Sequence, residues 1–114
     1  LEANPPIYFE RNLRSMVAVA RAHDVDIALS TWAWSPLAGD YVTWPHYRKG
    51  IAENNAVVKK VAAQTQTPLI DLETQMPKDQ KHWTDGRHVT AEGAERKAAL
   101  LAYWLTEMKL IVQQ

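Results

Sequence analysis

The order in which helical and strand-like segments alternate constrains the fold of this chain most strongly. Residues 25–32 (VDIALSTW) alternate in the way that is typical of a strand, and residues 68–72 (PLIDL) have the short, nearly continuous apolar character of a buried strand. We predict three helices, over residues 5–24, 48–64 and 90–112. Pro5 and Pro6 suit the first turn of the first helix, because that turn needs no backbone donor. Thr90 is suited to cap the last helix.

Strands that alternate with helices predict an α/β fold with a parallel sheet, in the order α-β-α-β-α. The near-continuous apolar character of residues 68–72 suits a strand covered by helices on both faces. We therefore expect part of a three-layer α/β/α, flavodoxin-like arrangement in a single domain over residues 1–114. A sheet of two strands leaves both of its edges open. Another polypeptide, or a second copy of the chain in a homo-oligomer, is expected to complete the sheet.

Residues 33–47, between the first predicted strand and the second predicted helix, are rich in aromatic side chains. A loop of this length in a small domain is often functional. Trp34, Tyr41 and Trp44 from this segment, together with Trp83, are therefore candidate substrate-binding residues. Alternatively, the same rings pack beneath the loop or fill a subunit interface, where aromatic residues are common.

Asp85 and His88 are three residues apart in a segment just before the last predicted helix. Histidine suits general-base chemistry because the unperturbed pKa of imidazole lies near neutrality. A carboxylate at this spacing can accept the proton of the other ring nitrogen and stabilise the imidazolium that forms during a reaction. Taken alone, however, the pair is more typical of a surface aspartate that caps a turn beside an exposed histidine.

The sequence around this pair favours the functional interpretation. Residues 83–94 (WTDGRHVTAEGA) resemble the last signature block of the SGNH/GDSL hydrolases, in which Asp-x-x-His precedes a small turn, a glycine and the C-terminal helix. Other segments resemble the preceding elements of that family in the same order, namely residues 9–14, 20–23, 27–31, 51–55, 61–62 and 68–72. The resemblance implies the C-terminal half of an SGNH-type fold, with Asp85 and His88 as the Asp/His part of a Ser-His-Asp triad.

The serine that would complete this triad is not found in the sequence. The family's nucleophile lies in a Gly-Asp-Ser motif, whereas Gly-Asp at residues 39–40 is followed by Tyr41, and no Gly-x-Asn-Asp motif for the oxyanion hole occurs. We interpret Ser15, Ser30 and Ser35 as structural residues. The resemblance therefore implies a portion of an ester hydrolase that acts on a small-molecule ester once an N-terminal half supplies the serine.

Two other functions remain open. His82, Asp85 and His88 have the residue types of a zinc or iron site, but Gly86 favours a loop there, and we expect neither a metal nor another cofactor. The chain would otherwise be a non-catalytic, self-associating module that binds through an aromatic groove.

Thirteen basic residues balance thirteen acidic ones, so the composition does not favour nucleic-acid binding. No apolar segment has the length that a membrane span needs.

Overall fold

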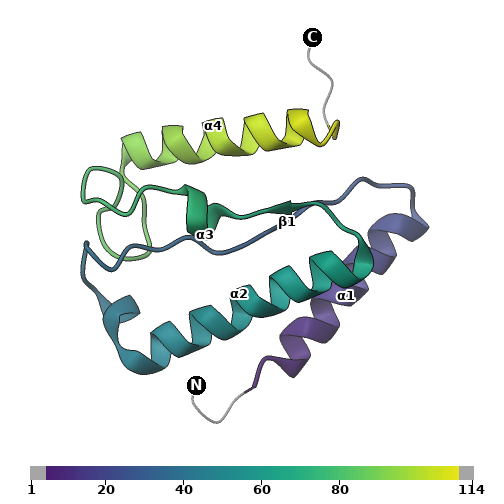
Figure 1. Cartoon of the computed structure of the whole chain (residues 1–114), viewed down its shortest axis with the longest axis horizontal. Helices are drawn as coiled ribbons and strands as arrows, with labels where there is room; N and C mark the ends of the chain where they lie inside the picture. The colour runs from purple at the N-terminus through teal and green to yellow at the C-terminus, as the bar shows by residue number, and fades with distance from the viewer. Residues whose placement is uncertain (1–4, 111–114) are drawn as a thin grey trace.

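The computed structural model describes residues 5–110, and its main helices and strands follow the predicted α-β-α-β-α order (Figure 1). The elements are α1 (Ile7–Ala22), β1 (Leu29–Ser30), the 3-10 helix η1 (Tyr41–Thr43), α2 (Pro45–Thr65), β2 (Leu69–Ile70), the short helix α3 (Leu72–Gln75) and α4 (Ala91–Glu107). Because β1 and β2 pair in parallel, the prediction of an α/β fold with a parallel sheet is confirmed.

The sheet lies between two layers of helices. In Figure 1, α1 and α2 lie on one side of the strands and α4 lies on the other. Leu29 and Leu69 are paired in register and pack with Val61 in the core cluster beneath α1 and α2. Ile70 packs with Trp83 in a second cluster beneath α4. Successive strand residues point to opposite faces of a sheet, so this short β-structure contributes to both cores.

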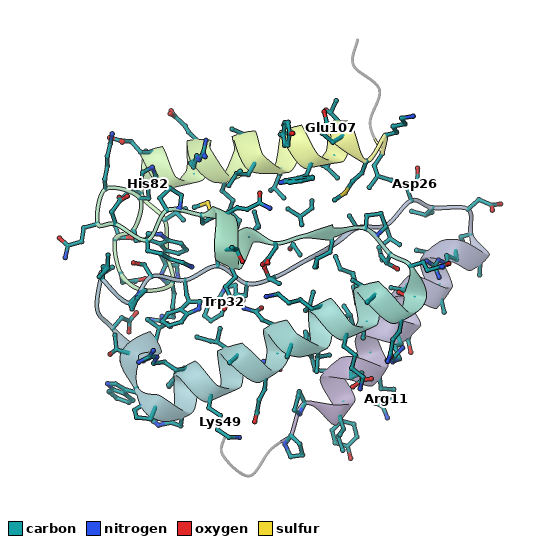
Figure 2. The ribbon with its side chains drawn as sticks, in the orientation of Figure 1. Arg11, Asp26, Trp32, Lys49, His82 and Glu107 are labelled. Atoms are coloured by element: carbon teal, nitrogen blue, oxygen red, sulfur yellow. The ribbon has the colours of Figure 1, made fainter. Side chains whose placement is uncertain are left out.

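The helix α2 begins earlier than predicted. It begins at Pro45 rather than near residue 48, because proline at the first turn removes only a donor that would have no partner in the helix. It ends at Thr65, and the capping residue Gln66 has a left-handed φ of 53°. Figure 2 shows Arg11 and Lys49 on the outer side of the layer that α1 and α2 form, as amphipathic helices require.

The cap of α4 is confirmed, whereas its predicted end is not. Thr90 Oγ1 accepts the backbone N–H of Gly93 at 3.1 Å. The helix ends at Glu107, and the left-handed φ of 58° at Lys109 ends the helical path before residue 110. The remainder of the predicted helix, residues 111–112, lies outside the described residues. Over residues 5–110, none of the helices has the length and hydropathy to cross a membrane.

Both strands are much shorter than the predicted segments 25–32 and 68–72, because each contains two paired residues. Strand geometry persists only where a neighbouring strand offers backbone partners. Before Leu29 the chain has just left α1, and the N–H of Val25 still donates to the carbonyl of Ala20 at 2.9 Å. After β2 the chain turns directly into α3, which begins at Leu72, the last residue of the predicted strand segment.

Beyond β1, a side chain takes the place of a neighbouring strand. Asn55 of α2 accepts the N–H of Trp32 at 2.8 Å through Oδ1 and donates to the carbonyl of Trp32 at 3.0 Å through Nδ2. Asn55 is buried, so this paired amide satisfies polar groups that would otherwise be costly to bury. The extended chain is therefore held against α2 where it leaves the sheet and enters the aromatic segment.

Candidate acid–base site

The segment between α3 and α4 folds into a tight turn that presents Asp85 and His88. Trp83 and Val89 form an antiparallel bridge at the base of this turn. Thr84 donates to the carbonyl of His88 through both its N–H and its Oγ1, each at 2.9 Å. These bonds fix the two ends of the turn, so the intervening residues have a defined geometry.

The carboxylate of Asp85 binds the imidazole of His88. Its Oδ2 lies 2.8 Å from His88 Nδ1, and its Oδ1 accepts the backbone N–H groups of Arg87 and His88 at 2.7 Å each. The hydrogen bond with the His88 ring, followed by those two N–H groups, lowers the pKa of Asp85 to about 2. The His88 side chain is 68% exposed. The ring nitrogen opposite Asp85, Nε2, is therefore accessible to a reacting group.

The turn packs against residues 35–42, and Gly86 is the point of closest contact. A Cβ atom at this position would lie 2.0 Å from Cγ2 of Val42 and 2.6 Å from the carbonyl oxygen of Gly39. The N–H of Ser35 donates to the carbonyl of Gly86 at 3.1 Å. The absence of a side chain at Gly86 thus allows the two loops to lie directly against each other.

Arg87 makes a second contact with the same loop. Its Nε donates to Oδ2 of Asp40 at 2.8 Å, and its guanidinium carbon lies 4.8 Å from the centroid of the Tyr41 ring. The hydrogen bond with Asp40 is the main reason that the pKa of Arg87 is raised. The turn that carries His88 is therefore joined to η1 through an ion pair and a cation–π contact.

Tyr41 and Trp44, two of the predicted substrate-binding residues, lie together beside this turn. Their ring centroids are 5.3 Å apart and the rings are edge-to-face, a favourable arrangement for aromatic pairs. Tyr47 lies 6.0 Å from Tyr41, and His46 lies 5.7 Å from Trp44, by the same measure. Tyr41 and Trp44 are both exposed. Their rings form a surface patch that contacts Arg87, the residue before His88, through Tyr41.

The other two predicted substrate-binding residues do not pack into this patch. Trp34 lies near two cations, because Cζ of Arg48 and Nζ of Lys78 are 5.8 and 5.9 Å from its ring centroid. Trp83 is 3% exposed and packs in the core beneath α4, where its Nε1 donates to the carbonyl of Pro77 at 2.6 Å. A ring buried to this degree supports the turn from inside rather than facing a groove.

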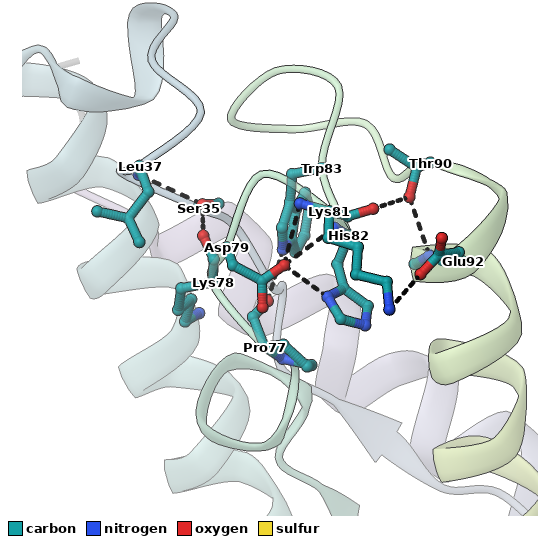
Figure 3. A network of polar contacts seen from close by, with 11 residues as sticks. Ser35, Leu37, Pro77, Lys78, Asp79, Lys81, His82, Trp83, Thr90 and Glu92 are labelled. Atoms are coloured by element: carbon teal, nitrogen blue, oxygen red, sulfur yellow. Dashed lines mark hydrogen bonds and ion pairs between the residues drawn. The ribbon is translucent and has the colours of Figure 1, made fainter.

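A second Asp-x-x-His turn, which we did not predict, lies six residues upstream (Figure 3). Asp79 Oδ1 lies 2.7 Å from Nδ1 of His82 and accepts the N–H groups of Lys81 and His82 at 3.0 and 3.2 Å. Asp79 and His82 are three residues apart, as Asp85 and His88 are, and this spacing could have indicated the second pair in the sequence. The His82 side chain is only 18% exposed, so this pair presents far less of its imidazole than Asp85 and His88 do.

The three residues considered as a metal site belong to separate pairs. His82 pairs with Asp79, whereas His88 pairs with Asp85. Within residues 5–110, no three or more side chains of His, Cys, Asp or Glu are grouped so that they could hold a metal ion. The geometry of the turn is instead that of a carboxylate which orients an imidazole.

The fold and the site together define a parallel α/β protein with an Asp–His pair in the loop before its last helix. The model of the GDSL-like lipase/acylhydrolase family matches residues 1–96, and the chain belongs to that family.

A solved structure supports the fold assignment. The crystal structure of a GDSL-like lipase from Bacteroides thetaiotaomicron VPI-5482 superimposes with a TM-score of 0.72 at 20% sequence identity. The match covers 93% of this chain and 55% of that chain, so this chain spans about half the length of the lipase. No protein with a curated description matches the chain.

Proposed function

We propose that this chain is the C-terminal portion of a Ser-His-Asp ester hydrolase and supplies its acid–base pair. His88 is the general base, and Asp85 fixes the orientation of its ring. The hydrogen bond between Asp85 Oδ2 and His88 Nδ1, together with the exposure of the opposite ring nitrogen, is the observation that supports these roles most directly. Membership of the GDSL-like lipase/acylhydrolase family supports a small-molecule ester as the substrate.

In the proposed reaction, a serine hydroxyl attacks the acyl carbonyl of the ester while Nε2 of His88 accepts the hydroxyl proton. The negative charge of Asp85 stabilises the imidazolium that forms. His88 then gives the proton to the departing alcohol, and water releases the acyl group from the serine in a second step of the same kind. This scheme uses no metal or other cofactor.

The nucleophilic serine is proposed to come from outside these residues. Ser35, whose backbone touches Gly86, is buried, and its Oγ donates to the carbonyl of Lys78. Ser15 Oγ donates to the carbonyl of Arg11 at 3.0 Å within α1. Both hydroxyls therefore already have backbone partners that are unrelated to His88.

The open side of the sheet supports the same proposal. Among residues 5–110, β1 and β2 are the only paired strands, and a sheet of two strands is marginal without further support. Met16, Val19 and Val25 are exposed although they are apolar, and together with Ile27, which lies just before β1, they line a hollow. We propose that an N-terminal half of the fold, rather than a second copy, covers this surface and extends the sheet, because the chain spans about half of the matched lipase.

The aromatic patch is the proposed contact for the ester. Tyr41 and Trp44 are exposed beside the turn that carries His88, so they are placed to hold the acyl or alcohol part of a substrate. Trp34, which lies near the cationic groups of Arg48 and Lys78, is proposed as a further contact outside this patch. Trp83 acts from the core by holding the base of the turn.

Complementation tests this function. The chain is fused behind a serine-bearing N-terminal half of a GDSL-type hydrolase, and hydrolysis of p-nitrophenyl acetate is measured. We expect the fusion to be active, and we expect His88→Ala to lower kcat/KM by at least about 10³-fold. His82→Ala is the matched control, because His82 belongs to the same kind of turn, and this variant should keep wild-type activity. Hydrolysis that survives His88→Ala would rule out the proposed role.

A further inference from the structure

We propose that Asp40 and Arg87 form a clamp that positions the acid–base turn, which makes Asp40 a positioning residue for His88. The inference rests on the proposed function only in taking His88 as the general base. The contact itself joins two segments that are 47 residues apart in the sequence, and it is independent of any reaction.

The ion pair is built from groups that are partly removed from solvent. The side chain of Asp40 is 10% exposed and that of Arg87 is 34% exposed. One carboxylate oxygen of Asp40 accepts Nε of Arg87 at 2.8 Å, and the other accepts the N–H of Tyr41. The guanidinium also lies over the Tyr41 ring. Exposed ion pairs are weak because water and salt screen them, and this pair is protected on the Asp40 side.

The backbone of Asp40 is held in a conformation that favours glycine. Its φ is 81° and its ψ is 180°, a region that residues with a side chain almost never adopt. Gly39, immediately before it, has a φ of 85°. Glycine at position 40 would relieve this strain, and the backbone carbonyl that accepts Thr43 would be kept. What aspartate adds at this position is the carboxylate, and its partner across the site is Arg87.

Arg87 transmits this contact to the imidazole. Its backbone N–H donates to Oδ1 of Asp85, the same carboxylate whose other oxygen lies against His88 Nδ1. Holding the side chain of Arg87 against Asp40 therefore limits the movement of the backbone that orients Asp85. The carboxylate in turn sets the direction in which His88 presents its free nitrogen.

The upstream pair is a natural comparison without such a clamp. In the turn of Asp79 and His82, Lys81 takes the place that Arg87 has in the other turn. Lys81 pairs at 2.9 Å with Glu92 in the first turn of α4, and both side chains are largely exposed (Figure 3). Each aspartate thus binds a histidine Nδ1 and two backbone N–H groups, but the upstream turn is held by Thr90, whose Oγ1 donates to the carbonyl of Lys81 at 2.6 Å, and not by Asp40. His82 is therefore an internal control for His88.

Nitrogen-15 NMR of the imidazoles in the 114-residue chain tests the clamp. At alkaline pH, where imidazole is neutral, the ring nitrogen shifts report the fraction of each histidine that carries its proton on Nδ1. Asp40→Asn removes the charge, keeps the shape and leaves the backbone strain at this position as it is in the wild type. We expect Asp40→Asn and Arg87→Gln each to reduce the Nδ1–H preference of His88 roughly three- to tenfold, as for a lost hydrogen bond. The preference of His82 should stay unchanged.

Asp40→Gly separates positioning from stability. It should release His88 as Asp40→Asn does, while the Tm stays at or above that of the wild type because backbone strain is relieved. An unchanged His88 signal in Asp40→Asn and Arg87→Gln would overturn the clamp, and so would an equal change in His82. Neither result depends on hydrolysis. If complementation fails and His88 still responds, the clamp stands and the hydrolase proposal does not.

Discussion

The close approach at Gly86 predicts that even the smallest side chain there displaces the acid–base turn. In Gly86→Ala the new Cβ would meet Cγ2 of Val42 at 2.0 Å, the carbonyl oxygen of Gly39 at 2.6 Å and that of Ser35 at 3.1 Å. Rotation of the valine would relieve only the first contact. The other two atoms belong to the backbone, so the two loops must separate.

The expected loss of stability follows from the packing. Forcing an extra carbon into a well-packed site costs roughly 1–3 kcal/mol, and loss of the hydrogen bond from Ser35 to Gly86 adds about 1 kcal/mol. We therefore expect Gly86→Ala to lower the free energy of unfolding by roughly 2–4 kcal/mol. Gly50→Ala in α2 is the matched control, because no atom lies within 4 Å of the added Cβ. It should raise the free energy of unfolding by about 0.5–1 kcal/mol.

Urea denaturation followed by tryptophan fluorescence measures both changes. The wild type and the two variants are compared at the same protein concentration, and a shift of the midpoint at constant slope reports a change in stability. The opposite signs of the two substitutions are the essential result. A Gly86→Ala variant as stable as the wild type would refute the close contact between the loops, whatever Gly50→Ala shows.

Two further predictions concern the polar groups. Asp85 has a folded pKa of about 2, below the value of 3.8 for a free side chain, so its hydrogen bonds with His88 stabilise the turn above pH 3.8 and are lost as the pH falls toward 2. Carbon-13 NMR of the carboxyl group measures this, and a pKa at or above 3.8 contradicts it. Thr31 is 1% exposed, donates to Asp71 at 2.7 Å and accepts the N–H of Glu73 at 2.9 Å. Thr31→Val should therefore lower the free energy of unfolding by about 1–3 kcal/mol, whereas Thr31→Ser keeps the hydroxyl; equal stability of the two variants by urea denaturation would argue against these bonds.

The order of the elements could be predicted from the sequence because periodicity is a property of each segment alone. The lengths of the strands could not be predicted, because a strand extends only as far as the adjacent strand offers backbone partners. Residues 25–27 alternate like a strand, yet within the described residues they have no strand beside them. Asn55, whose side chain replaces a neighbouring strand at Trp32, belongs to α2. The sequence pattern of the first predicted strand does not indicate this contact.

In the candidate site, too, contacts within one segment could be predicted from the sequence, whereas contacts between distant loops could not. The contacts between Asp85 and His88 span only three residues, so the pair could be proposed from the sequence once the surrounding residues 83–94 favoured it over a simple turn cap. The contact of Asp40 with Arg87 depends on how two loops pack, and Gly-Asp at residues 39–40 was informative in sequence only as a motif that lacks its serine. Trp83 could not be distinguished from Trp34 by composition, because burial of a loop tryptophan is decided by the core beneath it.

Efficient general-base catalysis requires an imidazole that is already oriented when the substrate arrives. Among residues 5–110, two loops supply the contacts that orient His88. Its own turn supplies the carboxylate and the backbone donors, and the loop before α2 supplies the surface that receives Gly86 and Arg87. A segment that brings a serine to this turn need not reshape it. The acid–base half of the proposed triad is therefore preorganised by residues 35–42 and 83–89, and a docking partner has only to place its nucleophile within reach of Nε2.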